Sequence, residues 1–82
     1  MNITFYKEDL KRIWNENNLT YDYFIQFDGS IDVYVEWGDW KHDHLFINFI
    51  MKKNNYRLVS ETTTEENGDD AYSSIHKFSY GA

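Results

Sequence analysis

The chain has 82 residues, a formal net charge of -6 at pH 7 and no cysteine. Its length predicts one domain over residues 1–82. Without cysteine there are no disulfides, thiolate zinc sites or thiol nucleophiles, which fits a reducing cytoplasm. The negative charge disfavours direct nucleic-acid binding. The sequence contains no run of about 18 apolar residues, which is the length that a membrane span needs. We therefore expect a cytoplasmic protein without membrane contact.

Aromatic residues make up 20% of the chain. Each ring buries roughly 150–250 Å², so a short chain still has enough material for a folded core. Some of these rings exceed what a small core can hide. The composition therefore favours a folded domain with an aromatic surface over a disordered chain.

The first half of the chain predicts a helix followed by a β-hairpin. Residues 4–18 place apolar side chains at helical spacing, with Thr4 as a candidate N-cap. Residues 20–27 and 31–37 alternate between apolar and polar positions, and Asp28-Gly29 between them is a strong hairpin signal. In the second strand we expect one face to carry Ile31, Val33, Val35 and Trp37.

The second half predicts another helix and two more strands. Gly38-Asp39 is expected to end the preceding strand and to cap a helix over residues 40–54. Every residue from 45 to 51 except Asn48 is apolar, so a buried strand is the competing interpretation. We expect one helix face to consist of Leu45, Phe46, Phe49, Ile50 and Lys53. Because the helix is apolar most of the way round, its second side needs a cover, either the first helix or a second subunit.

Residues 56–64 and 71–80 predict the third and fourth strands. The element order is then α-β-β-α-β-β. We expect an α+β fold of two layers, with a four-stranded, mostly antiparallel sheet and both helices on one face. The other sheet face would be open.

The cluster from Asp39 to His44 is the most metal-like segment of the sequence. On a helix, His42 and His44 point about 200° apart and cannot share a metal ion. Together with His76 they form the alternative hypothesis of a metal-binding protein or hydrolase. The favoured interpretation makes Asp39 and Asp43 acids of the first helical turn and His44 a solvated residue.

Other signs of catalysis are weak. Ser73 and Ser74 lie near His76, but no G-x-S-x-G motif accompanies them. No phosphate-binding glycine-rich loop is present. The sequence therefore predicts no catalytic residues, no metal ligands, no cofactor and no enzymatic activity.

Two groups of residues are candidates for partner binding. On the open sheet face, alternation places Phe24 and Tyr34 among acidic neighbours, a composition typical of protein interfaces, although tyrosine also suits any exposed strand. The loop region from Glu61 to Asp70 is acidic, either as a solvated turn or as a finger that engages basic residues. The candidates are Asp22, Phe24, Asp32, Tyr34, Glu36, Glu61, Glu65, Glu66, Asp69 and Asp70.

These features predict a small, acidic, non-enzymatic module that binds the basic surface of a protein partner. Frequent Asn, Lys and Ile suggest a low-GC bacterium or its phages and mobile elements. In size and composition the chain is similar to accessory proteins of such elements that inhibit nucleic-acid-handling proteins of the host, including anti-CRISPR, antirestriction and DNA-mimic proteins. The alternative is a homodimeric structural or regulatory domain that associates through the helix at 40–54.

Overall fold

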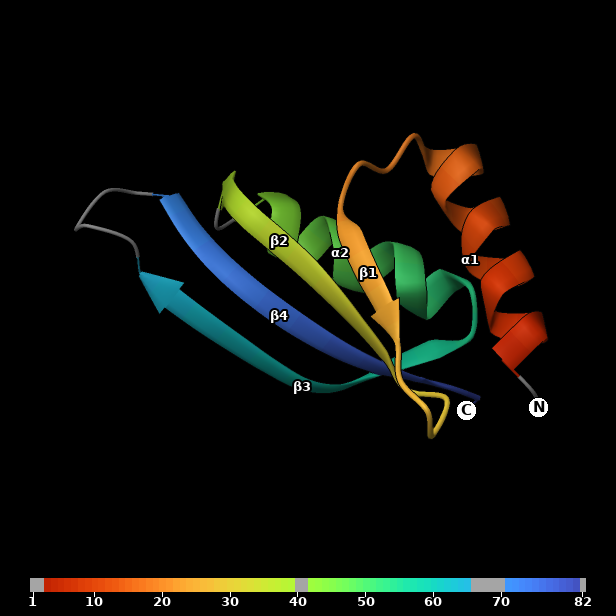
Figure 1. The fold of residues 1–82 in the computed structure, drawn as a ribbon. Coiled ribbons are helices and arrows are strands. Elements are labelled where there is room, and N and C mark those ends of the chain that lie inside the picture. The colour runs from red at the N-terminus through yellow and green to blue at the C-terminus, as the bar shows by residue number, and fades with distance from the viewer. Residues whose placement is uncertain (1–2, 40–41, 66–70, 82) are drawn as a thin grey trace.

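A computed structural model describes residues 3–39, 42–65 and 71–81, with side chains described for 3–36, 43–63 and 73–81 (Figure 1). The predicted α-β-β-α-β-β order is confirmed. The elements are α1 (Ile3–Asn17), β1 (Asp22–Ile25), β2 (Ile31–Asp39), α2 (His42–Lys53), β3 (Tyr56–Glu65) and β4 (Ala71–Tyr80).

The strands form one antiparallel sheet in the order β1-β2-β4-β3. Figure 1 shows α2 crossing behind the sheet and α1 beside β1 at the sheet edge. Both helices contribute to a single core on that side of the sheet. The α+β fold predicted from the sequence is therefore confirmed.

The core contains the strand residues that alternation predicted to face the helices. In β2 these are Ile31, Val33 and Val35, which are all buried, whereas the side chain of Trp37 lies outside the described part. Leu10 and Ile13 enter the core from α1, at the helical spacing that the sequence predicted. The buried hydrophobic residues are Leu10, Ile13, Ile31, Val33, Val35, Ile47, Ile50, Met51, Tyr56 and Phe78.

The apolar stripe described for α2 in the sequence is, apart from Ile50, not the side that packs on the sheet. The structure buries Ile47 and Met51 beside Ile50, while Leu45, Phe46 and Phe49 are exposed. Because this helix is apolar on most of its circumference, periodicity alone does not decide which stripe packs on the sheet. The exposed residues Leu45, Phe46 and Phe49 are called the α2 apolar patch below.

Two predicted element boundaries were wrong. Gly38 and Asp39 do not end β2; they pair with Tyr72 and Ala71 of β4 after a register shift that begins beyond Val35. An extra residue in one strand is the usual form of a β-bulge, and it lets β2 continue where the glycine suggested a break. At the N-terminus α1 begins at Ile3, so Thr4 lies inside the helix and is not its N-cap.

Three turns between elements contain a residue with positive φ, and one of them is the predicted Asp28-Gly29 hairpin. Asn18 follows α1 with φ 52° and Asn55 follows α2 with φ 72°, the left-handed conformation that commonly ends helices. Gly29 has φ 90° in the β1–β2 hairpin, where the Asp28 carboxylate accepts hydrogen bonds from the backbone N–H and hydroxyl of Ser30. The turn begins at Gln26, whose carbonyl accepts from the Gly29 N–H, so β1 ends earlier than predicted and Phe27 belongs to the turn.

In the described part of the chain, neither helix combines the length and apolar composition that crossing a bilayer requires.

Candidate functional site

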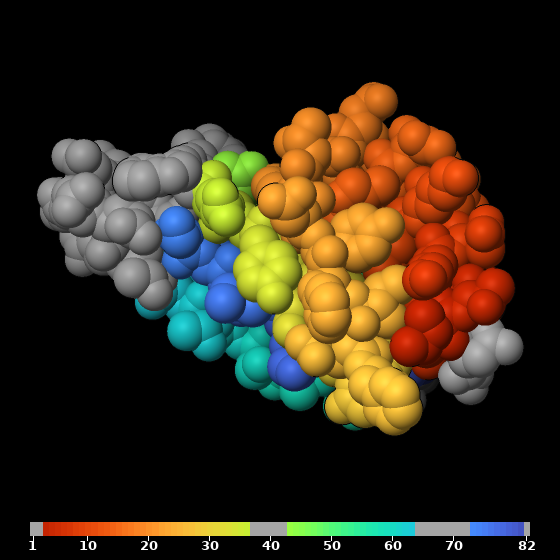
Figure 2. Space-filling model, in the orientation of Figure 1, coloured from red at the N-terminus to blue at the C-terminus, as the bar shows by residue number. Residues whose placement is uncertain are grey.

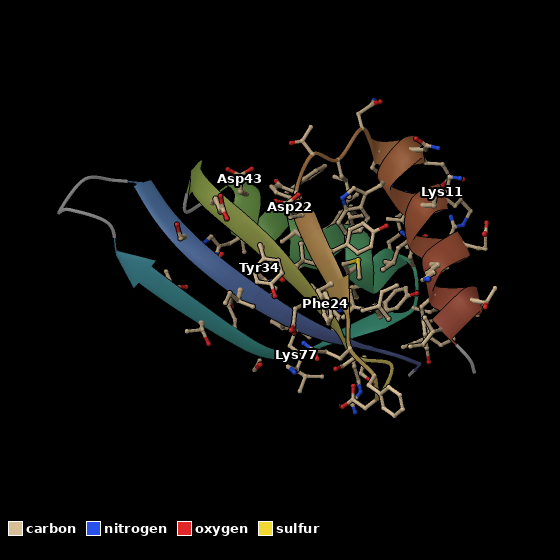
Figure 3. The ribbon with its side chains drawn as sticks, viewed as in Figure 1. Lys11, Asp22, Phe24, Tyr34, Asp43 and Lys77 are labelled. Carbon is tan, nitrogen blue, oxygen red and sulfur yellow. The ribbon has the colours of Figure 1, made fainter. Side chains whose placement is uncertain are left out.

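Four of the five candidate residues of β1 and β2 are placed by the strand register on one face of the sheet, the face without helices. Register pairs Asp22 with Tyr34 and Phe24 with Asp32, while the intervening pair of Tyr23 and Val33 points to the core side. Figure 3 shows Asp22, Phe24 and Tyr34 on the side of the sheet turned away from α2. The positions predicted for Asp22, Phe24, Asp32 and Tyr34 are confirmed, and Glu36 is exposed at the register shift of β2. The role of all five residues in partner binding stays a prediction.

This surface is called the open face. Its centre consists of two rows of side chains that cross the strands. One row runs from Phe24 through Asp32 and Lys77 to Ser60, and the other from Asp22 through Tyr34 and Ile75 to Thr62. Figure 2 shows side chains from all four strands at the surface of this view. No helix of the described chain covers them.

Exposure differs sharply among the residues of the open face. Phe24 is 56% exposed, whereas Asp32 is only 6% exposed. The Asp32 carboxylate accepts a hydrogen bond from Gln26 and lies 3.6 Å from the Lys77 ammonium. Asp32 therefore holds the side chains of Gln26 and Lys77 in place, whereas the carboxylates of Asp22 and Glu36 are exposed to solvent.

Asp43 extends the acidic region to α2. The hydroxyl of Tyr21, the residue before Asp22, donates to Asp43 Oδ1 at 2.6 Å. Asp43 belongs to α2 and is therefore not a member of the open face, but the bond to Tyr21 places its carboxylate next to the start of β1. Figure 3 labels Asp22 and Asp43.

Sequence reasoning missed Ile75 on this face and misplaced Phe27. Alternation in β4 allows either Ile75 or Phe78 to turn inward; the structure buries Phe78 and exposes Ile75. Phe27 was placed in a strand, but it lies in the hairpin turn with 98% of its surface exposed. A shallow groove of about 630 Å³ adjoins Phe24, and its other wall is α1 with Lys7 and Lys11. Which side of a short strand faces a core is set by its partners in the sheet, which local sequence does not reveal.

The predicted acidic finger is only partly within the described structure. Glu61 is not a part of it, because Glu61 turns to the helix side of the sheet and contacts two histidines. The backbone of Glu65 pairs with Tyr72 in the β3–β4 ladder, but its side chain lies outside the described part. Glu66, Asp69 and Asp70 also lie outside the described residues.

On the helix side, His44, Glu61 and His76 converge from α2, β3 and β4. His44 Nδ1 lies 2.8 Å from Glu61 Oε1, and His76 Nδ1 lies 3.6 Å from the same oxygen. The expectation that His44 is solvated was wrong, because only 5% of it is exposed. Of the histidines in the alternative metal hypothesis, the structure brings together His44 and His76, while the side chain of His42 is outside the described part.

Glu61 was not predicted at this site because of an irregularity in β3. Leu58 pairs with Phe78 and Ser60 pairs with Lys77, so β3 carries one extra residue at Val59. The bulge returns the strand to register such that Glu61 pairs with His76 and shares its face. Strict alternation from Leu58 would have placed Glu61 on the other side.

His76 has two further polar neighbours. Its Nε2 lies 2.8 Å from Ser74 Oγ and its Nδ1 lies 2.9 Å from Asn48 Oδ1. Burial lowers the pKa of His76, and the nearby Glu61 carboxylate only partly offsets this effect. Ser74 and His76 are within hydrogen-bond distance of each other, but both are buried. A substrate therefore could not reach the Ser74 hydroxyl in this structure.

No protein-family model, curated protein or solved structure matches this chain.

Proposed function

We propose that this protein is a non-enzymatic binding module that docks its open face on the basic surface of a partner protein. One observation carries the proposal. Phe24, which is 56% exposed, and Tyr34 lie next to exposed carboxylates on a sheet face that no described helix covers.

Each component of this surface has a physical role in binding. Aromatic side chains bury large areas at low cost in conformational entropy and dominate the affinity of many interfaces. The carboxylates of Asp22 and Glu36 lie beside them and would steer a positively charged partner toward them. Lys77 contributes little opposing charge, because it lies against the buried Asp32.

The charge of the surface favours protein over nucleic acid as the partner. Phosphate backbones are repelled by carboxylates, and the whole chain carries a charge of -6. Basic protein surfaces often serve to bind nucleic acid, so occupation of such a surface would inhibit that activity. This inhibition, a cytoplasmic location and an origin in a phage or mobile element are also parts of the proposal. They are supported by the size and composition of the chain and not by a specific site.

The test is affinity capture with matched charge reversals. Tagged protein is incubated with lysate of a low-GC bacterium, and the recovered proteins are compared between wild type, Glu36→Lys and Glu16→Lys. Both glutamates are exposed, but Glu16 lies on α1, where it pairs with Arg12. We expect Glu36→Lys to weaken capture of a basic protein about tenfold and Glu16→Lys to leave it unchanged.

Phe24→Ala separates the aromatic contribution from the charge. Loss of a central aromatic anchor costs about 2 kcal/mol, which is about a thirtyfold loss of affinity. Duplex DNA added to the lysate should compete if the partner surface is a nucleic-acid site. Equal recovery of the same protein by wild type, Glu36→Lys and Phe24→Ala would contradict the proposal.

A second candidate function is a homodimeric structural or regulatory domain. The α2 apolar patch favours it, since Leu45, Phe46 and Phe49 expose adjacent apolar surface on one helix. Light scattering decides between the two candidates cheaply. A strict monomer at high micromolar concentration excludes the dimer.

A further inference from the structure

We propose that His44, Glu61 and His76 bind one divalent first-row transition metal ion between α2 and the sheet. The site is separate from the open face, because these side chains lie on the helix side of β3 and β4. The proposal is therefore independent of partner binding.

The donor set matches this class of metal. Two imidazole nitrogens and one carboxylate oxygen form a mixed nitrogen and oxygen set that zinc and iron accept. Magnesium and calcium prefer oxygen ligands alone. Three protein ligands leave a further position for water or another oxygen donor.

The distances allow coordination after small side-chain movements. Metal–ligand bonds of about 2.0–2.1 Å in a tetrahedral site separate ligand atoms by about 3.3 Å. His76 Nδ1 and Glu61 Oε1 are 3.6 Å apart, and His44 Nδ1 and Glu61 Oε1 are 2.8 Å apart. All three ligand atoms lie within 4.8 Å of one another. To bring ligand atoms that lie up to 4.8 Å apart to about 3.3 Å, side-chain rotations must shorten that separation by up to about 1.5 Å. The backbone pairing of Glu61 with His76 would stay as it is.

Two neighbouring residues would support the metal-bound form. When His76 Nδ1 binds the metal, its Nε2 carries the proton and donates to Ser74 Oγ, which lies 2.8 Å away. In the metal-free protein Asn48 Oδ1 accepts a hydrogen bond from His76 Nδ1 at 2.9 Å. Metal binding at Nδ1 would replace this bond, and the amide oxygen would then lie next to the remaining coordination position. A hydrogen bond that fixes the orientation of a ligand histidine is a regular part of metal sites.

Burial defines the path of entry. The side chain of Glu61 is 33% exposed, while those of His44 and His76 are 6% and 0% exposed. A metal ion would therefore meet the carboxylate first and then the imidazoles. It would link α2 to β3 and β4 in a small chain that has no cysteine for disulfides.

The test measures zinc binding by the full chain. Protein made without a histidine tag is stripped with a chelator and titrated with zinc chloride by calorimetry. We expect one zinc ion per chain and a rise in the thermal midpoint with zinc but not with magnesium. Cobalt(II) bound at the same site should give the intense visible absorption of tetrahedral coordination.

Variants connect binding to these residues. Glu61→Gln keeps the size of the side chain and is partly exposed, so it should fold, and it should weaken zinc binding at least about a hundredfold. Ser74→Ala removes only the supporting hydrogen bond and should weaken zinc binding about tenfold. Glu16→Gln, an exposed carboxylate on α1, is the control and should bind as wild type does.

Two results would overturn the proposal. One is the absence of stoichiometric zinc binding by folded wild-type protein. The other is equal zinc affinity in wild type and in a Glu61→Gln variant whose metal-free melting shows that it is folded. Either result would leave the cluster as a hydrogen-bonded network without a metal role, and neither bears on partner binding by the open face.

Discussion

Replacement of Phe78 by alanine is expected to unfold a large fraction of the molecules. Phe78 is fully buried in β4, pairs with Ile31 and Leu58 in the neighbouring strands, and stacks against the His76 ring at 6.2 Å. Truncation of a buried phenylalanine costs about 3–5 kcal/mol, because it removes apolar contacts and leaves a cavity. Small domains have total stabilities of about 5–15 kcal/mol, and short chains lie at the low end.

Ile75→Ala is the matched control for Phe78→Ala. Ile75 belongs to the same strand but faces outward on the open face, where it is partly exposed. We expect this variant to lose less than about 1 kcal/mol. Urea unfolding followed by circular dichroism measures both. Equal losses in the two variants would show that the assigned core side of β4 is incorrect.

A steep loss of stability above about pH 10 is the second large expected effect. The hydroxyls of Tyr21 and Tyr56 donate to carboxylates, at 2.6 Å to Asp43 and 2.8 Å to Asp9. Burial, and then the adjacent carboxylate, raises the pKa of both tyrosines well above its usual value. These bonds tie the residue before β1 to α2, and β3 to α1.

The direction of the pH effect follows from the raised pKa. Both tyrosines stay protonated in the folded state, while those in the unfolded chain lose their protons near pH 10. Stability is therefore fully present below about pH 10 and is lost as the pH rises from there toward the folded-state pKa. The slope is up to about 1.4 kcal/mol per pH unit for each tyrosine, and Tyr21 contributes less because solvent screens its partly exposed ring.

Phenylalanine variants distinguish this effect from general alkaline damage. Tyr56→Phe should lose about 1.5–3 kcal/mol near neutral pH, because it removes a hydrogen bond to a charged group. Between about pH 10 and 12 it should show a shallower slope than wild type. Urea unfolding at several pH values gives both quantities. Parallel slopes in wild type, Tyr21→Phe and Tyr56→Phe would refute the assignment.

Several features of the fold that depend on local sequence were predicted correctly, although the Thr4 N-cap and the strand break at Gly38 were not. The alternation in residues 31–35 set the buried and exposed sides of β2, and Asp28-Gly29 identified the hairpin. The helix ends predicted at residues 18 and 54 lie within one residue of the observed ends at Asn17 and Lys53, and the nearby Asn18 and Asn55 adopt the left-handed conformation. These features depend on neighbouring residues alone, so periodicity and turn chemistry suffice.

The histidine cluster could not be predicted, because its formation depends on contacts between distant segments. Glu61 shares the face of His76 because the bulge at Val59 shifts the register of β3 by one residue. Nothing in the sequence around Val59 indicates that bulge. His44 is buried because α2 packs its Ile47 and Met51 side on the sheet, and a helix that is apolar most of the way round allows other choices.

One strand serves both proposed sites. In β4, Ser74, His76 and Phe78 face the helices, while Ile75 and Lys77 lie on the open face. Because successive side chains of a strand point to opposite faces of the sheet, the residues of the metal site and those of the open face alternate along β4. Substitutions at alternate positions of β4 should therefore change metal binding or partner binding separately.

Photo-crosslinking in the producing cell tests the role of the open face most directly. A photoreactive phenylalanine analogue replaces Phe24 in one strain and Phe49, in the α2 apolar patch, in another; both positions are exposed aromatics. We predict that illumination links position 24 to a protein with a basic surface, and that the Glu36→Lys substitution reduces the yield of this adduct. No adduct at position 24, together with an adduct between two copies of the chain at position 49, would contradict the account and favour the homodimer.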